Sequence, residues 1–177
     1  MIIVANKIDI PGSYDNYKKL IKEFKDYIII PVSAESELAL KEAAKHKLID
    51  YVPGDSTFNL HKGANITDKQ KKGLDFLKKE LETYKNTGAQ NAIESAVFKL
   101  LDQIAIFPGG VSKLEDQYGN VLPDCFLMKN GSTALDFAFK IHTDIGKKFI
   151  RAIDVKTKRT VGKEHKLNHR DVVEIIT

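Results

Sequence analysis

Two short apolar runs separated by one amphipathic segment constrain the fold of this chain most. Residues 2–5 have the sequence IIVA, and residues 27–32 have the sequence YIIIPV. Continuous β-branched runs of this length are typical of strands in a parallel sheet that is covered on both faces. Between the two runs, apolar side chains recur at helical spacing: Tyr14, Tyr17, Leu20, Ile21 and Phe24. The pattern predicts a strand-helix-strand unit and therefore an α/β fold.

The sheet predicted by this unit is small. A second helix is expected from about Ser36 to Lys47, but no third run of this kind follows it directly. Two strands are too few for a stable covered sheet. We therefore expect residues 1–50 to be the last part of a larger domain, with earlier strands in sequence that precedes Met1. The free edge of residues 2–5 is then expected to favour self-association, because unpaired β-branched edges recruit other chains.

Residues 51–110 predict a helical segment. Thr67 and Gln70 have the spacing of a capping box ahead of an apolar stripe, and Thr87 and Gln90 repeat that spacing. The second apolar stripe comprises Ile93, Val97, Leu100, Leu101 and Ile104. We expect a helical hairpin that ends at the Phe-Pro-Gly-Gly sequence of residues 107–110.

The last third of the chain has a different texture. Residues 111–123 are polar and predict a linker or a loose hairpin, whereas residues 124–177 alternate short strand-like runs with turns. Thr133 is expected to cap a single short helix. A short helix on a small mixed sheet is the β-grasp pattern, so the predicted fold class is α/β followed by α+β. Cys125, the one cysteine, is expected in the core and cannot form an internal disulfide, which is typical of cytoplasmic proteins.

Polar residues follow each of the two N-terminal strands. Asn6, Lys7 and Asp9 come after the first run, and Ser33 and Ala34 come after the second. In open α/β sheets, ligands bind beyond the carboxyl ends of the strands. Asp9 could accept hydrogen bonds from N1 and N2 of guanine, a donor pair that adenine lacks, so it would discriminate between the two bases.

The neighbours of Asp9 suit the same ligand. Asn6 could bridge the two loops and reach the other edge of the base, the aliphatic stem of Lys7 could cover the purine face, and the backbone N–H of Ala34 could donate to guanine O6. An N-K-x-D tetrapeptide alone has low specificity, and an aspartate that only stabilises a turn is the alternative. Its combination with Ser33-Ala34, about one strand-helix-strand unit later, favours guanine recognition.

These residues also carry a family resemblance. Asn6-Lys7-Ile8-Asp9 and Ser33-Ala34 resemble the fourth and fifth motifs of the translation-factor-related GTPases. Residues 118–123, 126–133, 142–146 and 171–175 resemble the TGS domain. The whole chain is similar to the C-terminal part of the Obg-like GTPases, nearest to their archaeal and eukaryotic YchF-related branch. The resemblance implies a truncated P-loop G-domain sheet with its last two parallel strands, then a helical segment, then a TGS-like β-grasp domain.

The phosphate-binding loop of such GTPases has no counterpart in this sequence. No G-x-x-x-x-G-K-[ST] pattern occurs in the 177 residues, and that loop supplies the lysine and backbone amides that hold the phosphates. The resemblance implies a longer parent that hydrolyses GTP with Mg²⁺. We expect this chain to be a fragment without catalytic residues, binding a guanine nucleotide no more tightly than about 1 mM, near 4 kcal/mol.

Positive charge is concentrated in the C-terminal third. Residues 1–123 hold 17 Lys and Arg against 17 Asp and Glu, whereas residues 124–177 hold 11 against 7. This excess, and the TGS resemblance, favour contact with RNA or the ribosome, although solvated lysines would give the same composition. The candidate phosphate contacts are Lys147, Lys148, Arg151, Lys156, Lys158, Arg159, Lys163, Lys166 and Arg170.

Other classes of site find less support. His165 and His169 are four residues apart, but no cysteine or carboxylate completes a metal-ligand set at suitable spacing, so no metal site is predicted. No run of about 18 apolar residues predicts a membrane span. Two further hypotheses stay open: an RNA- or ribosome-binding module whose nucleotide motifs are vestigial, and a module that only docks a partner protein.

Overall fold

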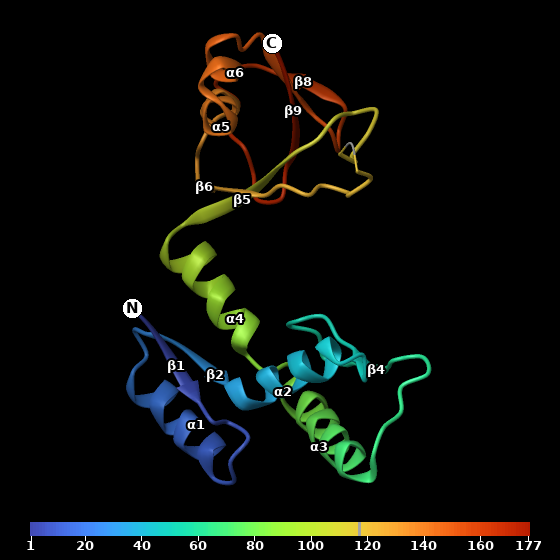
Figure 1. Cartoon of the computed structure of the whole chain (residues 1–177). Coiled ribbons are helices and arrows are strands. Elements are labelled where there is room, and N and C mark those ends of the chain that lie inside the picture. The colour runs from blue at the N-terminus through green and yellow to red at the C-terminus, as the bar shows by residue number, and fades with distance from the viewer. Residues whose placement is uncertain (117) are drawn as a thin grey trace. The chain divides into compact units, whose positions relative to one another are not determined.

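The computed structural model describes residues 1–116 and 118–177; Gln117, in the predicted linker, lies outside the described residues. The chain forms two compact units, Met1–Ala96 and Val97–Thr177 (Figure 1). The division falls within a π-helical turn, η1 (Ser95–Leu100). The boundaries expected after residues 50, 110 and 123 stay predictions.

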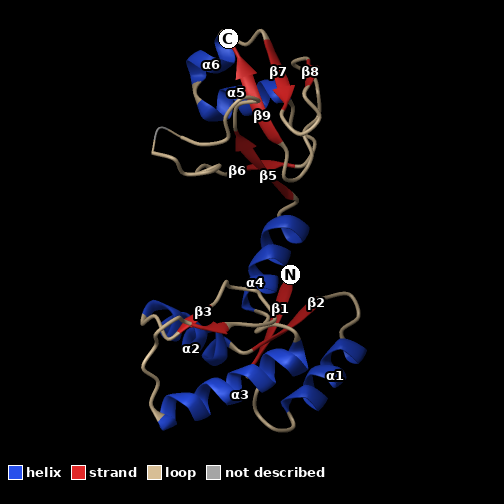
Figure 2. Ribbon diagram, turned by 90° about the vertical axis from the view of Figure 1, so that its right-hand side faces the viewer, coloured by secondary structure: helices blue, strands red, loops and turns tan. Residues whose placement is uncertain are grey.

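The N-terminal unit alternates strands and helices as predicted. Strands β1 and β2 pair in parallel, from Ile2 opposite Ile28 to Asn6 opposite Val32 (Figure 2). A second, antiparallel pair joins β3 to β4. The elements in chain order are β1 (Ile2–Asn6), α1 (Ser13–Glu23), β2 (Ile28–Val32), α2 (Ala34–Lys45), β3 (Ile49–Asp50), β4 (Asn59–Leu60), α3 (Asp68–Tyr84) and α4 (Ala89–Glu94).

The core of this unit lies away from β1. Its buried residues are Leu40, Ile49, Leu74, Leu77 and Leu81, contributed by α2, β3 and α3. On β1, in contrast, Val4 is 48% exposed and its apolar neighbours are half-buried. The prediction that this strand is covered on both faces is therefore wrong for the described residues, because the only strand paired with β1 there is β2.

One of the two predicted capping boxes is present. Thr67 and Gln70 exchange side-chain and backbone hydrogen bonds at the start of α3. The second box is wrong: Gly88, not Thr87, precedes α4, and no side chain caps that helix. Thr87 is buried, and its hydroxyl donates to Oε2 of Glu37 at 2.6 Å. A tertiary contact thus uses the hydroxyl that the sequence pattern assigned to a local cap.

The C-terminal unit is a mixed sheet with two helices, as the β-grasp pattern predicts. The five strands are ordered β6-β5-β9-β7-β8; β5 and β9 are parallel, and the other neighbouring pairs are antiparallel. The elements are β5 (Gln103–Pro108), β6 (Phe126–Lys129), α5 (Ala134–Ile141), α6 (Thr143–Lys147), β7 (Arg151–Asp154), β8 (Arg159–Val161) and β9 (Val172–Ile176).

Strand β5 corrects the predicted helical hairpin. Ile104 was expected on a helical stripe but lies in this strand, where it is buried together with Ala105 and Ile106. Asp102 adopts a left-handed backbone (φ 49°), which ends the preceding helical turn. A short apolar run cannot distinguish a buried strand from a helix by periodicity alone.

The core of the C-terminal unit is apolar and well covered. Phe137 of α5 is fully buried and packs with Ile106 and Met128 of the sheet, and Phe149 packs at the margin of this cluster. Thr133 forms the predicted cap of α5, as a full capping box with Asp136. Cys125 is exposed and precedes β6, so its predicted place in the core is wrong.

Candidate functional site

The parallel pairing of β1 and β2 brings the two candidate motifs together. Asn6 is the last residue of β1 and lies opposite Val32 in the register, one residue before Ser33. Its side-chain Oδ1 accepts the backbone N–H of Ala34 at 3.1 Å and that of Lys7 at 2.8 Å. Asn6 therefore bridges the two loops, as the sequence predicts.

This bridge gives the Ala34 N–H a different partner from the one expected. The sequence favoured donation from this N–H to guanine O6, but here it donates to Asn6. Ser33 has a structural role, because its hydroxyl accepts the N–H of Ser36 at 3.2 Å as the N-cap of α2 and also donates to the Ser36 hydroxyl at 2.8 Å. Both groups are thus satisfied by the protein itself.

The loop after β1 is held so that Lys7 and Asp9 flank an anchored residue. Ile8 is 4% exposed, and its N–H donates to the Val32 carbonyl at 3.1 Å. Lys7 is exposed and adopts a left-handed backbone (φ 67°), which is uncommon for a residue with a side chain. Its aliphatic stem is therefore free to cover a planar ligand.

Asp9 has an unsatisfied buried oxygen. Its Oδ1 atom is buried and has no hydrogen-bond partner among the described residues. Leaving such an acceptor unpaired costs on the order of 1–3 kcal/mol, more when the group is charged. Buried polar groups without partners are rare and call for an explanation, and a ligand that donates hydrogen bonds is one.

Glu80, which the sequence analysis did not single out, belongs to the same neighbourhood. It projects from α3 and accepts a short hydrogen bond from the Ser36 hydroxyl. Burial raises the pKa of Glu80; the hydrogen bond from Ser36 opposes that rise, and the negative charge of Asp9 adds to it. No motif identifies this residue, and the only signal in the sequence is its place beside Leu77 and Leu81 on the stripe of α3 that packs inward.

A small cavity lies beside the same loop. It has a volume of about 240 Å³. Tyr84, in its wall, donates its hydroxyl to the Ile8 carbonyl at 3.2 Å. The lining residues are Ile8, Tyr14, Tyr17, Pro31, Thr83, Tyr84, Asn86 and Asn91.

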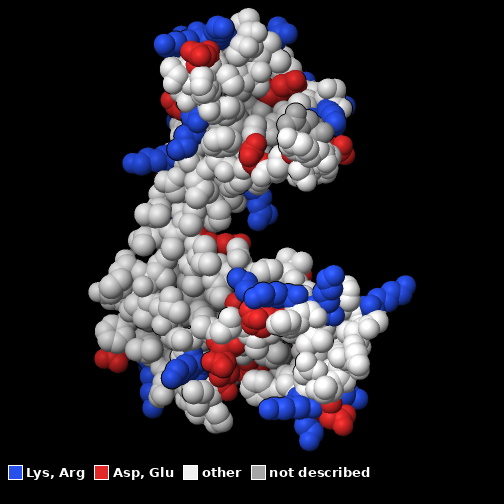
Figure 3. Space-filling view, in the orientation of Figure 1, with Lys and Arg blue, Asp and Glu red and all other residues white. Residues whose placement is uncertain are grey.

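The predicted RNA contacts are accessible but dispersed. All nine of the basic residues proposed for the C-terminal unit are exposed. They lie on α6, on β7 and β8 with the turn between them, and on the loop before β9. In the face shown in Figure 3, Lys and Arg side chains project at separate points and acidic side chains lie among them. The basic residues therefore do not gather into one patch on this face.

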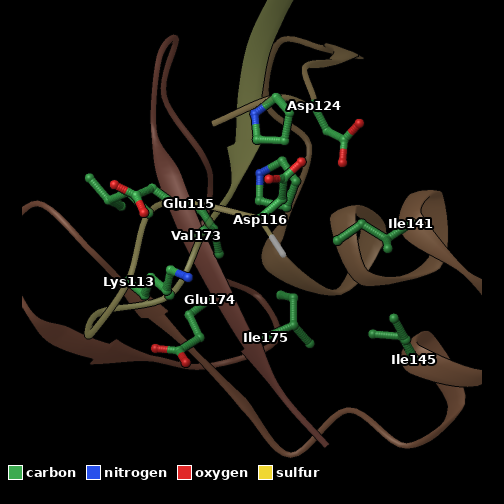
Figure 4. A pocket seen from close by; sticks show the side chains of 14 residues that line it. Lys113, Glu115, Asp116, Asp124, Ile141, Ile145, Val173, Glu174 and Ile175 are labelled. Carbon is green, nitrogen blue, oxygen red and sulfur yellow. The ribbon is translucent and has the colours of Figure 1, made fainter. Parts of the chain in front are cut away.

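The C-terminal unit also contains a cavity of about 400 Å³, drawn in Figure 4. Ile141, Ile145 and Ile175 line one part of it, and acidic side chains line another. Two of those acids serve the local backbone: Glu174 accepts the Val111 N–H at 3.0 Å, and Asp116 accepts from Tyr118 and Asn120. Hydrogen bonds, first from the Asn120 side chain, hold the pKa of Asp116 below its ordinary value.

Two further searches returned negative findings. Within residues 1–116 and 118–177, His, Cys, Asp and Glu form no group of three that could hold a metal ion. Across those same ranges, no helix has both the length and the apolar composition of a membrane span.

Known proteins show the same arrangement of motifs and domains. Residues 4–110 match the family described as "Obg-like GTPase YGR210-like, G4 motif-containing domain", and residues 118–177 match the TGS domain. The GTP-binding protein MJ1332 of Methanocaldococcus jannaschii is 46% identical over 178 residues, which cover all of this chain and 45% of that protein. The GTP-binding protein C428.15 of Schizosaccharomyces pombe is 28% identical over 150 residues, 75% of this chain and 34% of that one.

A solved structure supports the same assignment. The GTP-binding protein from Pyrococcus horikoshii OT3 is 40% identical and superposes with a TM-score of 0.72, over 100% of this chain and 45% of that one. The chain thus spans less than half the length of these relatives. It belongs to the Obg-like, YGR210-like GTPase family and ends in a TGS domain.

Proposed function

We propose that this chain supplies the base-recognition half of a guanine-nucleotide site, with Asp9 as the residue that selects guanine. The observation that carries the proposal is the buried, unpartnered Oδ1 of Asp9 at the carboxyl end of β1. Guanine presents two adjacent donors, N1–H and N2–H, that suit a carboxylate, whereas adenine would leave it facing an acceptor. The family assignment supports the same ligand.

The remaining loop residues have complementary roles in this proposal. Asn6 holds the two loops at a fixed distance through Ala34 and Lys7, so Asp9 is presented on a rigid edge. The stem of Lys7 covers one face of the base. Ser33 keeps α2 capped. For the Ala34 N–H to reach guanine O6, it would have to exchange Asn6 for the base, which is a local rearrangement of one hydrogen bond.

We further propose that hydrolysis requires groups from outside these 177 residues. Phosphoryl transfer depends on a phosphate-binding loop and Mg²⁺, which together neutralise the developing charge. No pattern of that loop occurs in the sequence, and the relatives are more than twice as long. The base alone supplies limited free energy, so the chain should bind GMP no more tightly than about 1 mM.

An exchange of base selectivity tests the role of Asp9. The Asp9→Asn variant replaces one acceptor oxygen by an amide donor, which suits xanthine because xanthine has a carbonyl in place of the guanine amino group. Titrations of labelled protein with GMP and XMP, followed by NMR, should show that GMP is preferred by the wild type and XMP by the variant. Equal affinities of both proteins for both nucleotides would contradict the proposal.

The exposed cations of the TGS domain favour a second function, contact with RNA or the ribosome in the cytoplasm. Nine Lys and Arg residues are exposed, and no ion pair between one of them and a described carboxylate is within 4.0 Å. Unpaired cations release counterions from a nucleic acid, so binding of this kind weakens steeply with salt.

Charge removal tests this second function. Changing Lys156, Lys158 and Arg159 to Ala should weaken binding of a fluorescent RNA and reduce its salt dependence by up to three contacts. The matched control changes Lys69, Lys71 and Lys72, three exposed lysines of α3, to Ala. RNA binding that ignores salt, or that both triple variants weaken equally, would argue against the TGS surface.

A further inference from the structure

The last turns of α3 and the linker that follows contact both base-recognition loops. Glu80 and Tyr84 are four residues apart and so share one face of the helix. Thr87 and Gly88 follow in the linker to α4. We call residues 80–88 the support segment, because every contact described below comes from it.

The support segment touches the loop that carries Asp9. The Tyr84 hydroxyl donates to the carbonyl of Ile8, the residue between Lys7 and Asp9, at 3.2 Å. Ser13 donates to the same carbonyl at 2.8 Å. Two hydroxyl donors on one carbonyl hold the peptide immediately before Asp9 in a single orientation.

The support segment also touches the loop that follows β2. The backbone N–H of Ser33 donates to the Thr87 carbonyl at 2.8 Å. A β-carbon on Gly88 would lie only 1.9 Å from the Pro31 carbonyl oxygen, so the two backbones are in close contact. Glu80 accepts from the Ser36 hydroxyl in the first turn of α2.

The charge of Glu80 matters because of the state of Asp9. Oδ1 of Asp9 has no partner among the described residues, and Glu80, close enough for the two charges to interact, is an acceptor when ionised and offers it no donor. The two carboxylates repel each other, so Asp9 stays without an internal partner. An amide at position 80 would reverse this, since its NH₂ group could donate to Asp9 while its oxygen still accepted from Ser36.

We propose that Glu80 is a positioning and specificity-determining residue of the base site. By offering no hydrogen to Asp9, it keeps both acceptor sites of that carboxylate available for the N1–H and N2–H donors of guanine. Tyr84 assists by fixing the peptide before Asp9. The inference rests on the proposed function, and it assigns part of base selection to the helical segment rather than to the strand-end motifs alone.

The test compares GMP with IMP, which lacks the N2 amino group. The ratio of their affinities, measured by NMR titration, reports the second hydrogen bond to Asp9. We expect Glu80→Gln to lower this ratio by about threefold to tenfold, the value of one hydrogen bond. Its thermal midpoint should stay equal to that of the wild type or rise, because Asp9 gains a partner. Tyr84→Phe should lower the ratio less, since Ser13 still holds the Ile8 carbonyl.

Two conservative variants serve as controls. Glu82→Gln removes an exposed carboxylate from the same helix, and Tyr17→Phe removes a hydroxyl that lines the same cavity and makes no hydrogen bond among the described residues. Both should keep the wild-type ratio. A Glu80→Gln variant that keeps it too, or that loses stability and binds GMP and IMP equally more weakly, overturns the inference.

Asp9→Asn separates the two levels of the hypothesis. If that variant loses the preference for GMP while Glu80→Gln keeps it, the guanine site stands and the role of Glu80 is wrong. If Asp9→Asn leaves the preference unchanged, the proposed function is wrong, and the inference that depends on it is wrong as well.

Discussion

The two units of this chain use their buried interiors differently. The five buried polar residues of the described chain all lie in Met1–Ala96, and four of them gather where β2 meets α2 and the support segment: Ser33, Ser36, Glu37 and Thr87. The interior of Val97–Thr177 is apolar, with Phe137, Ala134, Ala138, Ala152 and Ile106 fully buried. Its polar side chains serve exposed turns and helix caps.

This difference indicates which unit is specialised for chemistry. Buried polar networks contribute little net stability but fix geometry, and each lost partner is costly. The N-terminal unit accepts that cost around Asp9 and leaves apolar residues exposed on β1 and α1. The TGS domain has a conventional core and exposed charges, which suits a binding module. The predictions below test this contrast, from the largest expected effect to the smallest.

Removing the central aromatic of the TGS domain should have the largest effect. Phe137→Ala would open a cavity in a fully buried site and cost about 3–5 kcal/mol of unfolding free energy. Urea unfolding followed by NMR should show early loss of the β5 and β9 amide signals. Leu127→Ala, at a residue 45% exposed, should cost less than about 1 kcal/mol. Similar costs for both variants would contradict the assigned core.

A methyl group on Gly88 should damage the N-terminal unit selectively. Gly88→Ala meets the Pro31 carbonyl and adopts a positive φ of 79°, so we expect a loss of about 3 kcal/mol. Gly63→Ala, also at positive φ but with open space around it, should cost about 1 kcal/mol. Thermal unfolding of both variants measures the difference. Equal losses would mean that the support segment does not press against β2.

The buried network should give the N-terminal unit an alkaline transition. Burial, then the hydrogen bond to Glu37 and its charge, raise the pKa of Tyr51 to about 12 from 10.0. A raised pKa stabilises the protonated form, so this contribution is fully present below pH 10 and is lost as the pH rises from 10 to 12. The urea midpoint of this unit should fall across that window in the wild type and more gently in Tyr51→Phe. Identical slopes would remove Tyr51 from the network.

The smallest effect is expected in an exposed turn of the TGS domain. The side-chain hydrogen bond from Thr157, at 2.7 Å, is the main cause that lowers the pKa of Asp154. Thr157→Val should move that pKa back towards its ordinary value, as measured by NMR titration of the carboxyl group. A lowered pKa stabilises the fold above the ordinary pKa and ceases to do so in acid, so stability at neutral pH should change by less than about 0.5 kcal/mol. An unchanged pKa would contradict the assigned hydrogen bond.

The sequence predicted the elements whose signals are local. The β-branched runs gave β1 and β2 in the correct parallel order, and Thr67 and Thr133 gave two helix starts, because each pattern depends on residues within one turn. The family resemblance, carried by Asn6-Lys7-Ile8-Asp9 and the TGS segments, is also confirmed.

Features that depend on distant residues were missed. Ile104 was assigned to a helix because its strand neighbours, β6 and β9, are far along the chain. Glu80 contacts Ser36 across 44 residues, and Thr87 contacts Glu37 across 50. No local pattern predicts such pairs. The candidate loops could therefore be located from sequence, whereas the side chains that support them required the structure.

Mapping where guanine binds tests the central claim most directly. Addition of GMP to isotope-labelled protein should shift the amide signals of residues 6–9 and 33–35, with intermolecular contacts from the base to Lys7. The same concentration of AMP should shift them far less. If GMP and AMP produced the same shifts, or if the GMP shifts lay outside these two loops, Asp9 would not be a guanine-reading residue.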